Sequence, residues 1–308
     1  MRLVLLGRNG QVGWELQRSL ATLGEVIALD RNSVLPEGGS GDLADLDGLR
    51  AAVRGLRPDV IVNAAAFTAV DRAESEPELA HAINAEAPGV LAEIAQATGA
   101  WLVHYSTDYV FDGSGSAPWS EDDPPEPLSV YGATKLEGER RVTAACARHL
   151  ILRTSWVYAA RGGNFARTML RLAAERERLT VIDDQHGAPT GAELIADVTA
   201  LVLRRVTGRD PGASAHAGIY HLAAAGETTW AGYARFVLNA ARELRPDLTL
   251  KSREIAPVPS SAFPLPARRP LNSRLDTGRL RATFDLVLPP WQQGVHRMLT
   301  EILNPQMV

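Results

Sequence analysis

The sequence is poor in cysteine and in lysine, and each shortage excludes something. Cys146 is the only cysteine among 308 residues, so neither an intrachain disulfide nor a thiol-rich metal site can form. Of the 32 lysines and arginines, only Lys135 and Lys251 are lysines. Because the chain uses arginine almost everywhere that a positive charge alone would serve, Lys135 indicates a position that requires an amine.

The chain also lacks an excess of basic charge and any long apolar run. Its net charge of −4 and pI of about 6.0 disfavour nucleic acid and anionic membranes as partners and favour a small molecule. The first apolar run, residues 3–6, is too short for a signal-peptide core, and no later run approaches the length of a membrane span. A cytoplasmic location is therefore predicted.

What is present is an alternation of short apolar runs with longer amphipathic ones. The runs RLVLLG, EVIALD, DVIVNAAA, WLVHYST and HLILRTSW read as strands, and the stretches between them read as helices. This alternation predicts an α/β fold with a doubly wound parallel sheet covered on both faces. Expected helices include residues 77–98, 129–147, 193–206 and 230–244.

The alternation loosens after about residue 160, which predicts two parts. Residues 1–160 are expected to form the sheet domain, and residues 161–308 mainly a smaller, interleaved C-terminal lobe with segments returning to the sheet domain. Five prolines between residues 256 and 270 exclude a helix or a central strand, so this stretch is predicted to be an ordered loop.

A glycine-rich turn joins the first expected strand to the first helix. Gly7, Gly10 and Gly13 are spaced G-x-x-G-x-x-G, which differs from the usual G-x-G-x-x-G and could serve tight packing alone. A helix N-terminus beside such a turn suits a pyrophosphate. Asp30 ends the second strand, where an acidic residue accepts hydrogen bonds from an adenosine ribose. Arg31 follows and suits a 2′-phosphate, so NADH and NADPH both remain open.

Tyr131 and Lys135 lie four residues apart on an expected helix, so their side chains share one face. A phenol with a pKa of roughly 10 exchanges protons poorly at neutral pH unless a cation stabilises the phenolate. Lysine suits that role because its compact ammonium can also donate to a ribose hydroxyl. The alternative is an exposed helical pair.

Three polar residues, Ser106, Thr107 and Asp108, follow an expected strand at its carboxyl end. Ligands of open parallel sheets bind at this edge, so a hydroxyl here could meet the reacting oxygen. Alone, such a pair of hydroxyl residues more often caps a turn or helix.

Several motifs carry a family resemblance. The glycine turn with Asp30, NAAAFTAVDRAE, STDYVFDG and YGATKLEGE resemble the extended short-chain dehydrogenase/reductase superfamily. In the second half, SWVY, DDQHGAPTGAELIAD, GIYHLAAAGETTWAGYARF and RPLNSRLDTGRL resemble the dTDP-4-dehydrorhamnose reductase family, so the likeness spans nearly the full length. It implies a Rossmann-type domain that binds NADPH or NADH and a smaller lobe that binds a dTDP-sugar.

The resemblance also implies roles by position. Phe67 stands where this family often has tyrosine, which removes one hydroxyl near the cofactor. The implied catalytic residues are Tyr131, Lys135 and Thr107. The implied cofactor contacts are Gly7, Gly10, Gln11, Val12, Gly13, Asp30, Asp42, Leu43, Ala66, Phe67, Thr68, Tyr131 and Lys135. The implied substrate contacts are Thr107, Asp108, Trp156 and Arg268.

The implied reaction is reduction of the C4 ketone of dTDP-6-deoxy-L-lyxo-4-hexulose to dTDP-L-rhamnose. Hydride would pass from the nicotinamide to the carbonyl carbon while Tyr131 protonates the oxygen. Lys135 would lower the pKa of the phenol and fix the ribose. Arg268 and Arg269 could clamp the diphosphate, although loop arginines are more often solvated.

Two other functions are open. A nucleotide-sugar dehydratase would need an Asp-Glu pair beside the threonine, but Tyr109 follows Asp108 here. A non-catalytic binding subunit similar to the regulatory β subunit of methionine adenosyltransferase would share the whole fold.

The family resemblance also implies that two subunits could form a homodimer in which glutamates share a Mg²⁺ ion. Glu15 and Glu193 stand at suitable positions, but Gln292 and Gln293 occupy the place where another carboxylate would be wanted. The simpler interpretation is that both glutamates are solvated, and no metal-ligating residue is assigned.

Overall fold

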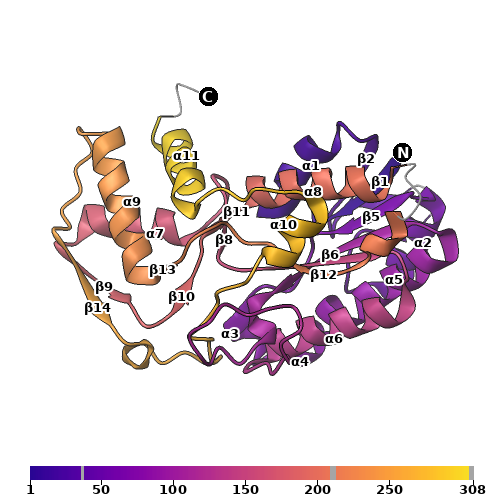
Figure 1. Cartoon of the computed structure of the whole chain (residues 1–308), viewed down its shortest axis with the longest axis horizontal. Helices are drawn as coiled ribbons and strands as arrows, with labels where there is room; N and C mark the ends of the chain where they lie inside the picture. Colours follow the sequence, from indigo (N-terminus) through magenta and orange to yellow (C-terminus); the bar gives the residue numbers. More distant parts are fainter. Residues whose placement is uncertain (36–37, 209–212, 305–308) are drawn as a thin grey trace.

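The structure is a computed structural model that describes residues 1–35, 38–208 and 213–304. Its centre is a six-stranded sheet in the order β12-β7-β6-β5-β1-β2, in which all neighbouring strands are parallel (Figure 1). The predicted parallel sheet is confirmed. The strands are β1 (Arg2–Leu6), β2 (Glu25–Leu29), β5 (Val60–Asn63), β6 (Trp101–Thr107), β7 (His149–Thr154) and β12 (Gly218–His221).

The strands are apolar on both sides because helices cover both faces of the sheet. In β1, Leu3 and Leu5 join one core cluster and Val4 and Leu6 join the other, and all four are 0% exposed. One face is covered by α1 (Gln11–Leu20), α8 (Ala192–Val206) and α10 (Gly278–Phe284) (Figure 1). The other is covered by α2 (Leu46–Leu56), α5 (Ala87–Thr98) and α6 (Val130–Ala145).

The strand order reverses at β1, which lies between β2 and β5. The chain crosses from β1 to β2 on one side and later returns to β5 on the other side. At such a reversal the loops that follow the two strands diverge and leave a crevice at the carboxyl edge of the sheet. The fold therefore places a binding crevice beside the glycine-rich turn.

A second apolar core forms the smaller lobe, seen at the left of Figure 1. It is built on α7 (Phe165–Glu175), α9 (Trp230–Leu244) and α11 (Trp291–Leu303). Between these helices in sequence, α8 packs on α1 and β12 pairs with β7, so the chain returns to the sheet. Residues 218–221 thus form an edge strand of the main sheet.

The proline-rich stretch begins with a strand, where a loop was expected. Strand β14 (Glu254–Val258) contains Pro257 and pairs in parallel with β9 (Arg178–Ile182) in a two-stranded sheet. Both strands are edges, so the missing N–H of Pro257 is tolerated.

The short elements are β3 (Val34–Leu35), β4 (Gly39–Ser40), β8 (Val157–Tyr158), β10 (His186–Gly187), β11 (Thr190–Gly191), β13 (Thr228–Thr229), η2 (Asp108–Val110), η3 (Ala213–His216) and η4 (Ser260–Ala262).

The helix expected over residues 77–98 is interrupted. It consists of α4 (Pro77–His81), the π-helical turn η1 (Ala82–Glu86) and α5, and α3 (Val70–Ala73) precedes it. Such turns insert a residue into the helical ladder and often occur at functional sites.

None of the helices in the described ranges combines the length and apolar character that a membrane span needs.

Candidate active site

A cleft of about 1100 Å³ opens along the carboxyl edge of the sheet. It gathers side chains that are far apart in the sequence, from the turn after β1 to the segment after β7. The predicted site residues that line it are Gly7, Gly10, Gln11, Val12, Asp30, Asp42, Leu43, Ala66, Phe67, Thr68, Thr107, Asp108, Tyr131, Lys135 and Trp156.

The glycine turn leaves the first helix open at its N-terminus. Gly7 has φ +88, and a Cβ there would lie 2.7 Å from the backbone nitrogen of Ala65. Gly10 caps α1 without any side-chain hydrogen bond, so the N–H groups of the first turn face the cleft and suit an anion. Gly13 does not line the cleft, and its Cβ would lie 2.0 Å from the carbonyl oxygen of Gly7. Gly13 is therefore a packing glycine.

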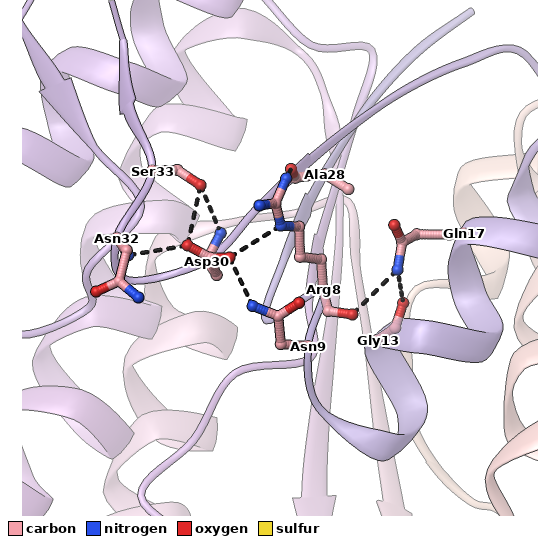
Figure 2. A network of polar contacts seen from close by, with 8 residues as sticks. All are labelled: Arg8, Asn9, Gly13, Gln17, Ala28, Asp30, Asn32 and Ser33. Carbon is pink, nitrogen blue, oxygen red and sulfur yellow. Dashed lines mark hydrogen bonds and ion pairs between the residues drawn. The ribbon is translucent and has the colours of Figure 1, made fainter. Parts of the chain in front are cut away.

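Asp30 is the centre of a hydrogen-bond network at the end of β2 (Figure 2). Its Oδ2 accepts hydrogen bonds from Arg8 Nε at 2.9 Å and Asn9 Nδ2 at 2.6 Å. Its Oδ1 accepts from the N–H of Asn32 and from Ser33 Oγ. Burial raises the pKa of the Asp30 carboxyl, but these bonds and the charge of Arg8 outweigh it and lower the net pKa. Asp30 is thus a charge-compensated carboxylate.

Asn84, in the π-helical turn, fixes the loop after β5. Its Oδ1 accepts from the N–H of Phe67 at 2.8 Å, and its Nδ2 donates to the Phe67 carbonyl at 3.1 Å and to Thr134 Oγ1 at 3.2 Å. One buried amide therefore joins the cofactor side of the cleft to helix α6. We did not predict this role, although an asparagine inside an expected buried helix was a signal for it.

Helix α6 brings Tyr131 and Lys135 into the cleft. Its N-cap Ser129 accepts from the N–H of Gly132 at 3.2 Å. A Cβ at Gly132 would lie 2.2 Å from the carbonyl oxygen of Tyr109, so only glycine lets the helix start this close to the segment after β6.

Lys135 is 2% exposed and is held at its amine. Its Nζ donates to the carbonyl of Tyr105 at 2.6 Å and lies 3.2 Å from His104 Nε2. Burial lowers the pKa of Lys135 to about 8, against the opposing charge of Glu139. Burial and the charge of Lys135 hold the pKa of His104 well below its usual value, so this imidazole is neutral.

His104 continues a buried polar chain. Its Nδ1 lies 3.1 Å from Asn63 Nδ2, and the two residues are direct neighbours on β6 and β5. Asn63 Oδ1 in turn accepts from the N–H of Ala65. We did not predict either residue, although a histidine within the buried run WLVHYST indicated a satisfied polar site.

Tyr131 lies beside two other predicted residues. Tyr131 and Thr107 both line the cleft, and Thr107 Oγ1 donates to Asp108 Oδ1 at 3.1 Å and accepts from the N–H of Tyr109 at 3.2 Å. Burial raises the pKa of Tyr131 to about 12, and the opposing influence of the Thr107 hydroxyl is smaller. Lys135 is not among the groups that shift this pKa, because Tyr105 and His104 hold its amine, so the expected lowering by Lys135 stays a prediction. With its pKa raised by burial, the phenol is protonated at neutral pH.

Asp108 is buried, and burial raises its pKa to about 6 although Oδ1 accepts a hydrogen bond from Thr107. Asp108 Oδ2 has no hydrogen-bond partner within the described residues. The same holds for the hydroxyls of Ser106, Thr154 and Ser155, which also line the cleft. Buried polar atoms without partners suit a ligand that carries several hydrogen-bonding groups.

Trp156 and the arginine pair lie in different surroundings. Trp156 lines the cleft and stacks on Trp230, with ring centroids 3.8 Å apart. Arg268 is exposed and does not line the cleft, so its contact with the substrate stays a prediction. Arg269 donates to both carboxylate oxygens of Asp71, at 3.0 and 2.7 Å. The guanidinium of Arg269 is therefore already paired with Asp71.

The glutamates considered for Mg²⁺ are paired with arginine. Glu15 lies 3.6 Å from Arg18, and Glu193 lies 4.0 Å from Arg297. In the described ranges, no group of three His, Cys, Asp or Glu side chains could hold a metal ion. Nothing within the described part of this single chain supports Mg²⁺, and no role is derived for it.

Comparison with known proteins gives a consistent result. The family model described as "RmlD substrate binding domain" matches residues 1–304. The dTDP-4-dehydrorhamnose reductases of Salmonella typhimurium and Escherichia coli K12 are 56% and 55% identical over 304 residues, which cover 99% of this chain and of each relative. The crystal structure of the Bacillus anthracis dTDP-4-dehydrorhamnose reductase in complex with NADP is 32% identical and superposes with a TM-score of 0.85, covering 97% of this chain and 99% of that one.

Proposed function

The chain belongs to the RmlD substrate-binding-domain family, and on that premise we propose the reaction that its cleft carries out. It is an NAD(P)H-dependent dTDP-4-dehydrorhamnose reductase. It reduces the C4 ketone of dTDP-6-deoxy-L-lyxo-4-hexulose to the alcohol of dTDP-L-rhamnose. The observation that carries this proposal is that Tyr131, Thr107 and the buried Asp108 meet in one cleft, with Thr107 hydrogen-bonded to Asp108.

The side chains of the cleft divide the work of a ketone reduction. When bound, the reduced nicotinamide supplies the hydride. Tyr131 is protonated at neutral pH and donates its proton to the oxygen at C4 of the sugar, as a general acid. Thr107 donates to Asp108 in the structure and, with substrate bound, would turn its one proton to the reacting oxygen, and Asp108 accepts from a sugar or nucleotide hydroxyl through Oδ2.

Different residues of the cofactor site suit the successive parts of a dinucleotide. The open N-terminus of α1 and the close approach at Gly7 suit the pyrophosphate, and Asp30 suits the adenosine ribose. Lys135, one helical turn after Tyr131, donates to the nicotinamide ribose. In this role the ammonium also stabilises the phenolate that forms after proton transfer.

The adenosine end of the site suits both NADH and NADPH, because Arg8 pairs with Asp30 (Figure 2). A bare carboxylate at Asp30 would repel a 2′-phosphate, but Arg8 neutralises it, and Arg31 also lines the cleft. With NADH, Asp30 accepts from the free 2′-hydroxyl. With NADPH, the guanidinium groups of Arg8 and Arg31 compensate the phosphate.

The dehydratase alternative lacks its second carboxylate. The ring of Tyr109 meets the ring of Tyr131 edge to face, with centroids 5.4 Å apart. An elimination of water would need an acid at this position, and tyrosine cannot supply a carboxylate. We therefore favour reduction over elimination.

The test is a direct assay of both cofactors. The dTDP-4-keto sugar, after its 3,5-epimerisation, is mixed with the protein, and the absorbance of NADPH or NADH is followed together with the dTDP-L-rhamnose formed. Oxidation of either cofactor in step with product supports the proposal. Stable absorbance with every dTDP-keto sugar, together with co-purification of a synthetase, would instead identify a non-catalytic binding subunit.

Two expectations about setting accompany the proposal. We place the reaction in the cytoplasm, which cell fractionation tests, and we expect a homodimer on the basis of the family resemblance, which analytical ultracentrifugation tests. The proposal requires neither nucleic acid nor a membrane as a partner.

A further inference from the structure

Trp156 adopts a backbone conformation that bulky residues rarely take. Its φ is +48, and the other described non-glycine residues with positive φ are Arg57 and Asp285. Those two end helices α2 and α10, where a left-handed residue is ordinary. Trp156 instead lies between β7 and β8, in the wall of the cleft. Such strain persists only where the surroundings impose it.

Part of the constraint acts on the backbone. Strand β8 follows Trp156 directly and pairs with β11, with Thr190 opposite Val157. The N–H of Thr190 donates to the carbonyl oxygen of Trp156 at 3.1 Å. These contacts fix the backbone on the C-terminal side of Trp156 but do not determine the direction of its side chain.

The direction of the side chain is set by Trp230. The two indole rings stack with centroids 3.8 Å apart and planes 14° apart. Strand β13 ends immediately before Trp230 and pairs with β10, with Thr228 opposite Gly187. A Cβ at Gly187 would lie 2.7 Å from Trp156 Cε2, so glycine gives the indole its space.

Trp230 is itself held and does not line the cleft. Its Nε1 donates to Gln185 Oε1 at 3.0 Å, and Gln185 Nε2 donates to Ser260 Oγ at 2.9 Å. Gln185 is only 6% exposed, so this amide is well fixed. The ring of Phe165 lies 4.7 Å from that of Trp230. Trp230 therefore meets the lining of the cleft through its stack on Trp156.

We propose that Trp230 is a positioning residue that holds Trp156 at the wall of the substrate site, and that Gln185 fixes Trp230. The inference rests on the proposed function only in taking a dTDP-sugar as the ligand that meets Trp156. The stack fixes the Trp156 indole at the wall of the site before the ligand binds. Ligand binding therefore does not carry the entropy cost of ordering this side chain.

A spectroscopic test needs no substrate. Two stacked indoles couple their electronic transitions and give an exciton band in far-ultraviolet circular dichroism. We expect this band in the wild type, its loss in both Trp156→Phe and Trp230→Leu, and its retention in Trp291→Phe. Trp291 is the matched control because it is buried in the same lobe, 5.8 Å from Tyr233, without stacking on Trp156. Loss of the band in the control would overturn the assignment of the pair.

The kinetic test separates positioning from general damage. For Trp230→Leu we expect KM for the dTDP-4-keto sugar to rise about tenfold, with kcat within about threefold and cofactor Kd unchanged. Trp230→Phe keeps an aromatic plane and should restore KM to within about threefold of wild type. A KM for Trp230→Leu that stays within about twofold of wild type would overturn the proposal.

Two further measurements keep the test decisive. If Trp230→Leu does not fold, Gln185→Leu carries the comparison, and a KM for Gln185→Leu within about twofold of wild type overturns the proposal. Calorimetry with dTDP alone should show about tenfold weaker binding to Trp230→Leu. A wild type with neither turnover nor dTDP binding overturns the proposed function, whereas the exciton band still decides whether Trp230 holds Trp156.

Discussion

Lys135 shows at the scale of one residue why a sequence rich in arginine retains a lysine. Its ammonium fits between the carbonyl of Tyr105 and the ring of His104 in a space that is almost closed to solvent. A guanidinium is planar and wider, and its five donors would need partners there. Shape, and not charge alone, is therefore what this position requires.

From this geometry we expect Lys135→Arg to lose activity almost as fully as Lys135→Ala, within a few-fold in kcat, and to bind the cofactor more weakly. The wild-type pH profile of kcat/KM should fall as pH rises through about 8, where the buried amine loses its proton. The arginine variant should lack this limb. Near-normal turnover in Lys135→Arg would show that charge alone suffices.

Tyr131 has the clearest catalytic prediction. Tyr131→Phe removes the proton donor but keeps the ring that packs against Tyr109. We expect kcat to fall about a hundredfold or more, with cofactor Kd nearly unchanged. Tyr109→Phe is the matched control, because it alters the neighbouring phenol, and kcat should remain within about threefold. Equal losses in the two variants would assign the effect to packing.

Asp30 gives the prediction on cofactor choice. Asp30→Ala removes the acceptor for a 2′-hydroxyl and leaves Arg8 free, so we expect NADH binding to weaken about tenfold and NADPH binding to change less. Arg8→Gln is the mirror control. It should weaken NADPH more than NADH, because the uncompensated carboxylate then faces the phosphate. Titration of both variants with both cofactors measures this, and equal losses would contradict the assignment.

At the scale of elements, α6 depends on a contact that no local pattern reveals. The sequence YGATK indicated a helix with two catalytic residues on one face, and this helix is present. What could not be predicted is that Gly132 faces the carbonyl of Tyr109, a residue more than twenty positions earlier. The π-helical turn was missed for a related reason, since residues 77–98 read as one helix and Asn84 makes its bonds to Phe67 and Thr134, which are distant in the sequence.

A substitution at Gly132 tests that contact. In Gly132→Ala the new methyl would meet the Tyr109 carbonyl at 2.2 Å, so the start of α6 must shift and carry Tyr131 with it. We expect a loss of about 1–3 kcal/mol in stability and a clear fall in kcat. Gly89→Ala in α5 is the control, because its Cβ would lie at an ordinary 3.4 Å from Arg141, and it should be neutral or slightly stabilising. Urea unfolding of both variants gives the comparison.

At the scale of the whole molecule, the parallel sheet and the glycine turn followed from the sequence because they depend on periodicity and strand ends, whereas most of the cleft residues were implied by the family resemblance. The partners of those residues followed from neither. Trp230, Gln185, His104 and Asn63 act through contacts between segments that only the fold brings together. Arg269 illustrates the same limit, since its pairing with Asp71 joins two loops that lie far apart in the chain.

Helix α8 joins the core of the lobe to one of the two core clusters of the sheet, which leads to the last prediction. Leu194 on α8 packs against the cluster of the sheet and against that of the lobe. The cleft is likewise lined from the glycine turn to Trp156. A cofactor bound there should therefore stabilise the whole chain as one unit. At a cofactor concentration of one hundred times Kd the gain is about 2.7 kcal/mol.

This gain should raise Tm by several degrees while the transition remains single, since roughly 2–4 °C accompany each kcal/mol in a protein of about 150–250 residues. Differential scanning calorimetry with NADPH and with NADH measures it. Asp30→Ala supplies the control, because its shift should shrink more with NADH than with NADPH. A second transition that ignores the cofactor would show that the lobe unfolds independently and that the contacts of α8 do not couple the two cores.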